Sequence, residues 1–136
     1  MQPIAHASLP HQDQLLADYL QAFLGELEPV ALALLRQHLQ WVEVAGGEVL
    51  MQQGEAGDAL YLAVSGRLRA YVQQEDGTQR AVREMSPGQI IGEMSLITDE
   101  PRSATVVAIR DSVLVRLDKV HFAALLATSP QLSLVL

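Results

Sequence analysis

The spacing of apolar side chains changes twice along the chain, and each change marks a boundary between kinds of structure. Residues Asp13–Phe23 and Glu28–Gln40 carry leucines three and four positions apart, which places them on one face of a helix. From Trp41 to Leu117 the period shortens to two, between turns rich in glycine, which is typical of strands. Helical spacing returns at Asp118–Thr128. The pattern therefore predicts two helices, a run of strands and a further helix.

The central region is expected to form many short strands joined by turns. Asp76-Gly77 is a hairpin signal, and Gly66 is predicted to be a turn between two strands, Ala59–Ser65 and Arg67–Gln73. The other expected strands are Trp41–Val44, Val49–Met51, Thr78–Met85, Ile90–Ile91, Ser103–Ala108 and Val113–Leu117. Many short strands favour a sandwich or a barrel, and helices at both ends make the fold class α+β.

The two ends of the chain have their own patterns. Met1–His11 is polar and interrupted by prolines, so a loose arm is expected there. Gly25 is expected to end the first helix, and Pro29 suits the first position of the second. We interpret His38 as a surface residue of that second helix. Pro130–Leu136 is expected to begin another, strongly apolar helix that is continued by further chain or pairs with a second copy in a homodimer.

Bulk composition narrows the function classes. The 136 residues suit one domain, and a hydrophobic fraction of 49% is ordinary for a globular protein. A net charge of −7 argues against a nucleic-acid surface, which needs clustered Lys and Arg. The chain has no cysteine, and no signal peptide or apolar stretch of transmembrane length is apparent. We expect a cytoplasmic protein with no membrane segment and no metal.

The segment Gly92–Thr105 carries the chemistry. Gly92 lets the backbone approach a ligand, and the next five residues can form a helical turn with Glu93 near its start. After a break in that turn, Arg102 presents a planar fork of donors suited to phosphate oxygens. Glu93 is a poor partner for phosphate but a good acceptor for a sugar hydroxyl. Taken singly, these residues would be read as a solvated or salt-bridged pair; together they favour a ligand with both groups.

The two motifs in this segment, G-E-x-x-L at residues 92–96 and P-R-S-A-T at residues 101–105, resemble the phosphate-binding cassette of cyclic nucleotide-binding domains. The resemblance extends over roughly residues 20–130, and such domains occur in catabolite activator proteins and protein kinase A regulatory subunits. It implies that Arg102 pairs with the cyclic phosphate and Glu93 binds the ribose 2′-hydroxyl, while backbone N–H groups of the cassette complete the cradle. The implied ligand-binding residues are Gly92, Glu93, Met94, Ser95, Arg102, Ser103 and Ala104.

The resemblance also implies the architecture and the role. The fold would be an antiparallel, jelly-roll-like β-roll over residues 41–118, with a helical arm at 1–40 and the start of C-terminal helices at 119–136. A small residue at Ser103 goes with adenine in related domains, so the implied ligand is cAMP rather than cGMP, with no other cofactor. The domain would regulate an attached effector or a partner protein. A later helix would cover the base, and Pro130–Leu136 is expected to begin it.

Other functions remain open at this point. The domain can be a ligand-free structural or dimerisation copy of the fold, or the sensor half of a catabolite-activator-type transcription regulator. No nucleophile elbow, phosphate-binding P-loop, zinc-protease motif or cysteine nucleophile is found, so we expect no catalysis within these residues. The runs Trp41–Glu48 and Gly57–Leu62 resemble sensor domains of bacterial patatin-like esterases related to neuropathy target esterase, which suggests one effector.

Overall fold

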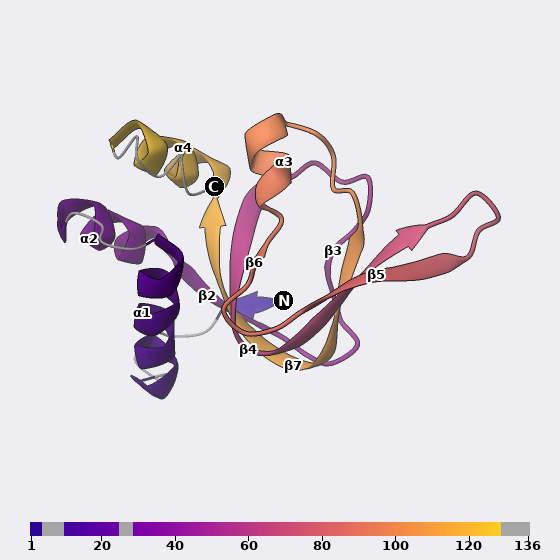
Figure 1. Ribbon diagram of the computed structural model, residues 1–136, viewed down its shortest axis with the longest axis horizontal. Helices are drawn as coiled ribbons and strands as arrows, with labels where there is room; N and C mark the ends of the chain where they lie inside the picture. The colour runs from indigo at the N-terminus through magenta and orange to yellow at the C-terminus, as the bar shows by residue number, and fades with distance from the viewer. Residues whose placement is uncertain (4–9, 25–28, 129–136) are drawn as a thin grey trace.

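The computed structural model describes residues 1–3, 10–24 and 29–128 (Figure 1). The expected helix end at Gly25 and the expected helix at Pro130–Leu136 lie outside these residues. Gln2–Pro3 does not belong to a loose arm, because it forms strand β1 and pairs with Glu43 and Val42 on the sheet.

The described residues include four helices, and the three long ones fall where the periodicity predicts. They are α1 (Pro10–Leu24), α2 (Pro29–His38) and α4 (Lys119–Thr128), and the short α3 (Glu93–Thr98) lies in the cassette. Helix α2 begins at Pro29, as expected from the fixed φ of proline. Figure 1 shows α1, α2 and α4 gathered beside one end of the strands, whereas the β4–β5 hairpin extends away from them.

The strands form one antiparallel sheet that curls into the expected β-roll, so the fold class is confirmed. The strand order is β1-β2-β7-β4-β5, with β3 paired to β7 and β6 paired to β4. Their bounds are β2 (Gln40–Val44), β3 (Val49–Met51), β4 (Ala59–Gln73), β5 (Gln79–Met85), β6 (Ile90–Ile91) and β7 (Thr105–Asp118).

Two predicted strand breaks are wrong. Gly66 does not reverse the chain: its φ of +96° lies in the left-handed region and marks a shift of register inside the continuous strand β4. The partner strand β7 likewise runs on through residues 109–112, where two separate strands were expected. The pairing of β4 with β7 extends from Ala59 opposite Asp118 to Tyr71 opposite Thr105, so both strands bend together instead of ending.

Strand β4 divides the core into two apolar clusters. Its even-numbered residues Leu60, Leu62 and Val64 belong to the cluster beneath the helices, with Leu16, Leu20, Leu35, Phe122 and Leu125 among the other members. Its odd-numbered residues Ala59, Tyr61 and Ala63 belong to the cluster inside the roll, with Val44, Leu68, Met85 and Leu114. Both faces of this stretch are covered, which explains why residues 59–64 are apolar without interruption.

Candidate ligand site

The seven predicted site residues border a single cavity. It has a volume of about 190 Å³ and lies between the cassette and the inner face of the roll. Its lining consists of Met51, Ala70, Val82, Arg83, Met85, Ile91, Gly92, Glu93, Met94, Ser95, Arg102, Ser103, Ala104 and Val106. The structure therefore brings all seven together, and their roles toward a ligand stay predictions.

Arg102 is a nearly buried cation in the wall of this cavity, with 5% of its surface exposed. Its Nη1 donates to the carbonyl of Gly92 at 2.9 Å, and its Nη2 donates to the carbonyl of Ala59 at 2.6 Å. The nearest carboxylate oxygen, on the exposed Asp58, is 3.9 Å from Nη2. Because neutral carbonyls supply most of these contacts, the guanidinium keeps positive charge to offer to an anion.

Backbone pairing fixes Arg102 from its other side. Its N–H donates to the carbonyl of Glu55 at 2.8 Å, and its carbonyl accepts from the N–H of Gly54 at 2.8 Å. The cassette is thereby joined to the loop between β3 and β4. Within the described ranges, the next two N–H groups, on Ser103 and Ala104, donate no hydrogen bond to protein. They remain available to an acceptor at the cavity.

Gly92 is required at its position for two reasons. Its φ of +83° lies in the left-handed region, and a Cβ placed on it would lie 2.4 Å from Nη1 of Arg102. It also precedes α3 as the helix cap, so the cassette backbone turns directly beside the guanidinium. The sequence led us to expect that the Gly92 backbone approaches a ligand closely; in the structure, the group that it approaches closely is the side chain of Arg102.

The α3 residues that border the cavity differ in burial. Glu93, the first residue of the helix, is half-buried, and its carboxylate has no hydrogen-bond partner among the described residues. Met94 is 59% exposed, whereas Ser95 is buried. Ser95 packs on Gly57, where an added Cβ would lie 2.2 Å from the Ser95 Cβ. Gly57 thus allows α3 to approach the loop before β4.

Sequence reasoning missed the apolar wall of the cavity. Ala70 and Met85 are buried on the inner face of the β4–β5 pair, and Arg83 lies two residues before Met85 on the same strand. The pairing shifts between Ala70 and Tyr71, so Val82 is an extra residue and borders the cavity together with Arg83. The alternation of side chains along β5 would have predicted that Arg83 and Met85 face the same side of the sheet. The position of the register shift could not be predicted in this way, because it depends on how β5 pairs with β4.

Contacts also connect the cassette to the start of α4. Asp99, which ends α3 with a φ of +59°, pairs with the Lys119 side chain. The Lys119 N–H donates to the carbonyl of Asp58 at 2.9 Å, and the Asp58 carboxylate lies 3.4 Å from Nη2 of Arg116. Asp58 therefore stands between Arg102 of the cavity and the first residue of α4.

Comparison with known proteins now identifies the family. The profile of the family described as "Cyclic nucleotide-binding domain" matches residues 41–129, which is well over half of the chain. The chain belongs to the cyclic nucleotide-binding domain family. The matched range begins within β2 and includes strands β3 to β7, the cassette and α4.

Other members of the cyclic nucleotide-binding domain family share both sequence and fold. The chain is 35% identical over 111 residues to lysophospholipase nte1 of Neurospora crassa, covering 82% of this chain and 7% of that protein. It superposes on the crystal structure of Thermus thermophilus catabolite activator protein with a TM-score of 0.75, at 31% identity, covering 83% of this chain and 53% of that one. On the Toxoplasma gondii protein kinase A regulatory domain, solved with cAMP, the TM-score is 0.79 at 26% identity, covering 85% and 45%.

These similarities confirm the resemblance inferred from the cassette. They also agree with the suggested relation to patatin-like esterases, because the chain is 38% identical over 79 residues to patatin-like phospholipase domain-containing protein 7 of Rattus norvegicus, covering 58% of this chain and 6% of that protein. This chain spans only 7% of the length of lysophospholipase nte1. No helix in the described ranges is both long and apolar enough to cross a membrane.

Proposed function

We propose that this chain is a sensor module that binds a cyclic nucleotide, prefers cAMP, and regulates an effector attached to it or associated with it. The observation that carries the proposal is the nearly buried Arg102 guanidinium in the wall of an open cavity. A buried cation held mainly by carbonyl groups is an unusual feature unless an anion completes its environment.

The phosphate end of the ligand would lie against Arg102. The guanidinium offers charge-assisted hydrogen bonds, and the N–H groups of Ser103 and Ala104, which donate to no described acceptor, extend the donor set. Charge and oriented donors on the same wall of the cavity suit a singly charged phosphodiester.

The sugar and the base would occupy the rest of the cavity. The Glu93 carboxylate accepts hydrogen bonds only, so it would select a ligand hydroxyl such as the ribose 2′-hydroxyl. The apolar wall formed by Ala70, Met85 and Val106 would take the base. Ser103 has a small side chain at the position expected to bear on base choice, which supports cAMP over cGMP.

The regulatory role is supported by the longer proteins in which similar domains occur. Lysophospholipase nte1 contains a region similar to this chain within a far longer protein, and the similar Toxoplasma regulatory domain was solved with cAMP. We propose that these residues sense and transmit and do not themselves catalyse. Among possible effectors, a lipid esterase of that kind has the support of the 35% identity.

A second function, a ligand-free copy of the fold, is favoured by one specific observation. The two hydrogen bonds from Arg102 to Gly92 and Ala59 already hold the guanidinium without any anion. In that case Arg102 would be a structural link between the cassette and β4, and the cavity would bind no nucleotide.

Titration calorimetry separates these two functions. We expect cAMP to bind the wild type, and Arg102→Ala to lose about 2–5 kcal/mol of binding free energy, because the ligand phosphate then lies unpaired. That loss corresponds to roughly 30-fold to several-thousand-fold in affinity. Arg80→Ala is the matched control, because Arg80 is an exposed arginine of β5 that does not border the cavity. No binding of either cyclic nucleotide to the wild type would favour the ligand-free copy. Binding unchanged in Arg102→Ala would show that Arg102 is not the partner of the phosphate.

The choice of base has a test of its own. Competition between cAMP and cGMP for the wild-type site should favour cAMP. Ser103→Thr should shift the ratio toward cGMP, since a threonine hydroxyl goes with guanine in related domains. A clear preference of the wild type for cGMP would refute the cAMP assignment and leave the cyclic-nucleotide site itself in place.

A further inference from the structure

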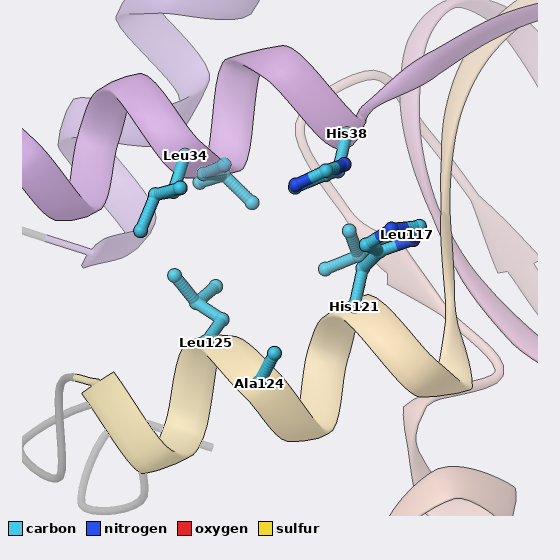
Figure 2. A pocket seen from close by; sticks show the side chains of 7 residues that line it. Leu34, His38, Leu117, His121, Ala124 and Leu125 are labelled. Atoms are coloured by element: carbon cyan, nitrogen blue, oxygen red, sulfur yellow. The ribbon is translucent and has the colours of Figure 1, made fainter.

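Two histidines from distant parts of the chain stack on each other between α2 and α4. His38 is the last residue of α2 and His121 is in the first turn of α4, and Figure 2 shows their rings turned toward one another. The ring centroids are 3.8 Å apart and the ring planes differ by 16°. His38 is therefore half-buried in a helix contact, which corrects its interpretation as a simple surface residue. The groove around the pair is otherwise apolar, lined by Leu34, Leu35, Leu117, Ala124 and Leu125.

One carboxylate serves this pair. Asp118 caps α4, since its Oδ1 accepts the backbone N–H of His121 at 2.8 Å, and its Oδ2 lies 2.8 Å from Nδ1 of the His121 ring. The cap hydrogen bond from the His121 backbone, more than any other contact, lowers the pKa of Asp118 below its ordinary value. Asp118 therefore stays ionised across the range, about pH 5 to 8, in which imidazoles ordinarily titrate.

Three cations are close to the pair in sequence, and two of them are paired with carboxylates elsewhere. Arg116 precedes Asp118 on β7 and lies near Asp58, Lys119 pairs with Asp99, and Arg36 lies two residues before His38 on α2. None of them adds negative charge. Within the described residues, Asp118 is the one carboxylate in contact with a ring of the pair, the ring of His121. It can balance a single imidazolium.

We propose that the His38–His121 stack is a proton-sensitive clasp between α2 and α4. With one proton on the pair, an imidazolium beside Asp118 lies over a neutral ring, which is a favourable arrangement. A second proton places two like charges face to face about 4 Å apart, and the single carboxylate cannot offset both. The helices then separate at this contact.

The ring geometry argues against a metal in place of a proton. Imidazole lone pairs lie in the ring plane, so two nearly parallel stacked rings do not direct them at a common point. Within the described residues no group of three metal-ligating side chains is placed to hold an ion. The stacked rings are therefore suited to bind protons and not a metal ion.

Hydrogen exchange followed by mass spectrometry tests the clasp without any ligand. In the wild type, protection of the α2 and α4 amides, corrected for intrinsic exchange rates, should fall as the pH is lowered from about 7.5 to about 5.5. We expect a fall of about tenfold, because the separated helices bind one more proton than the closed contact, and an imidazole of ordinary pKa, about 6.5, takes up most of that proton over this range. The amides of β4 and β7 should stay protected, because the change is confined to the helices.

The control variant keeps the stacked ring and removes its proton site. In His38→Phe the α4 protection should change little over the same pH range, and Gln37→Ala, an exposed neighbour on α2, should behave as the wild type. If His38→Phe does not fold, His38→Gln makes the same test with a neutral polar side chain. Protection that is independent of pH in the wild type, an equal loss in the His38 variants, or an equal loss in β4 and β7 would overturn the proposal.

A consequence for signalling rests on the proposed function as well as on the clasp. Lys119, the first residue of α4, is bonded to Asp58 and to Asp99, which ends the cassette helix α3. If both ligand and protons change the position of α4, then protonation of the histidine pair alters the affinity for the ligand, and the ligand alters the affinity for the proton by the same factor. Cyclic AMP affinity would then change with pH in the wild type and not in His38→Phe. The exchange experiment stands even if no nucleotide binds.

Discussion

The carbonyl of Gly92 accepts a hydrogen bond from Nη1 of Arg102, and the space for a side chain on Gly92 is filled by that same guanidinium. A residue with a Cβ cannot occupy position 92 without moving the arginine, because the two atoms would be 2.4 Å apart. The two positions, ten residues apart in sequence, therefore depend on each other.

Gly92→Ala should weaken ligand binding by about ten- to hundredfold, because the displaced guanidinium no longer faces the phosphate. Gly77→Ala is the control: Gly77 has a φ of +86°, yet nothing lies within 4 Å of its missing Cβ. Both variants should lose roughly 1–2 kcal/mol of unfolding free energy from the left-handed backbone. Calorimetry and urea unfolding on the two variants measure both effects. Equal ligand affinities in the two would mean that Arg102 tolerates the displacement.

Glu93→Gln should remove selectivity for the ribose hydroxyl. The amide keeps the shape of the side chain but is a weaker acceptor, so we expect a loss of about 1–3 kcal/mol of binding free energy with cAMP. The 2′-deoxy analogue should bind the wild type less well than cAMP does, and the variant should discriminate much less between the two. If both proteins discriminate to the same degree, the carboxylate has a different partner.

Gly66→Ala should be among the more destabilising single substitutions in the roll. An added Cβ would lie 2.2 Å from Oγ and 2.5 Å from Cα of Ser112, which is fully buried in β7. The left-handed backbone costs roughly 1–2 kcal/mol and the overpacking a further 1–3 kcal/mol, which gives about 2–5 kcal/mol together. Gly77→Ala should show only the first part, so equal unfolding free energies in urea would contradict the close contact.

Glu84 should make stability depend on pH in the acid range. Its pKa is lowered, first by the hydrogen bond from Arg69 and then by that from Arg67. The unfolded chain therefore binds the proton more readily than the folded one. The stabilisation is present above the ordinary glutamate pKa, about 4.3, and is lost as the pH falls through the lowered folded value.

The measurement is the urea midpoint above and below that window, at about pH 6 and about pH 3. Glu84→Gln should show a smaller difference between the two midpoints than the wild type, because it lacks the titrating carboxyl. Glu75→Gln is the control, since Glu75 is an exposed glutamate of the β4–β5 turn. If the wild type and Glu84→Gln showed the same pH dependence of stability, the hydrogen bonds from Arg67 and Arg69 to Glu84 would not be its cause.

Local signals were sufficient for the helices, the Asp76-Gly77 hairpin and the grouping of the cassette residues, because each depends on neighbours in sequence. Asp76 accepts from the Thr78 backbone at 3.0 Å across that turn, so the hairpin chemistry is contained in five residues. The extra residue at Val82 and the continuity of β4 and β7 depend on how strands far apart pair, and no local pattern contains that information.

Contacts between side chains far apart in sequence were the hardest features to predict from the sequence. His38 and His121 are 83 positions apart (121 − 38), and each has an ordinary helical setting. The apolar wall of the cavity comes from strands on either side of the cassette for the same reason. By contrast, Gly92 and Arg102 were recognised because a short chain segment carries both.

The unbroken pairing of β4 with β7 also has a consequence for the rate of folding. Ala59 meets Asp118 across 59 positions (118 − 59), and the whole cassette lies within the loop that this contact closes. Loop-closure entropy must be overcome before such distant contacts are rewarded, so we expect this roll to fold in milliseconds to seconds, as other sheets dominated by non-local pairing do. Since Ala59 supplies a carbonyl that holds Arg102, the cavity acquires its arginine only after that closure. A ligand would then slow unfolding far more than it hastens folding.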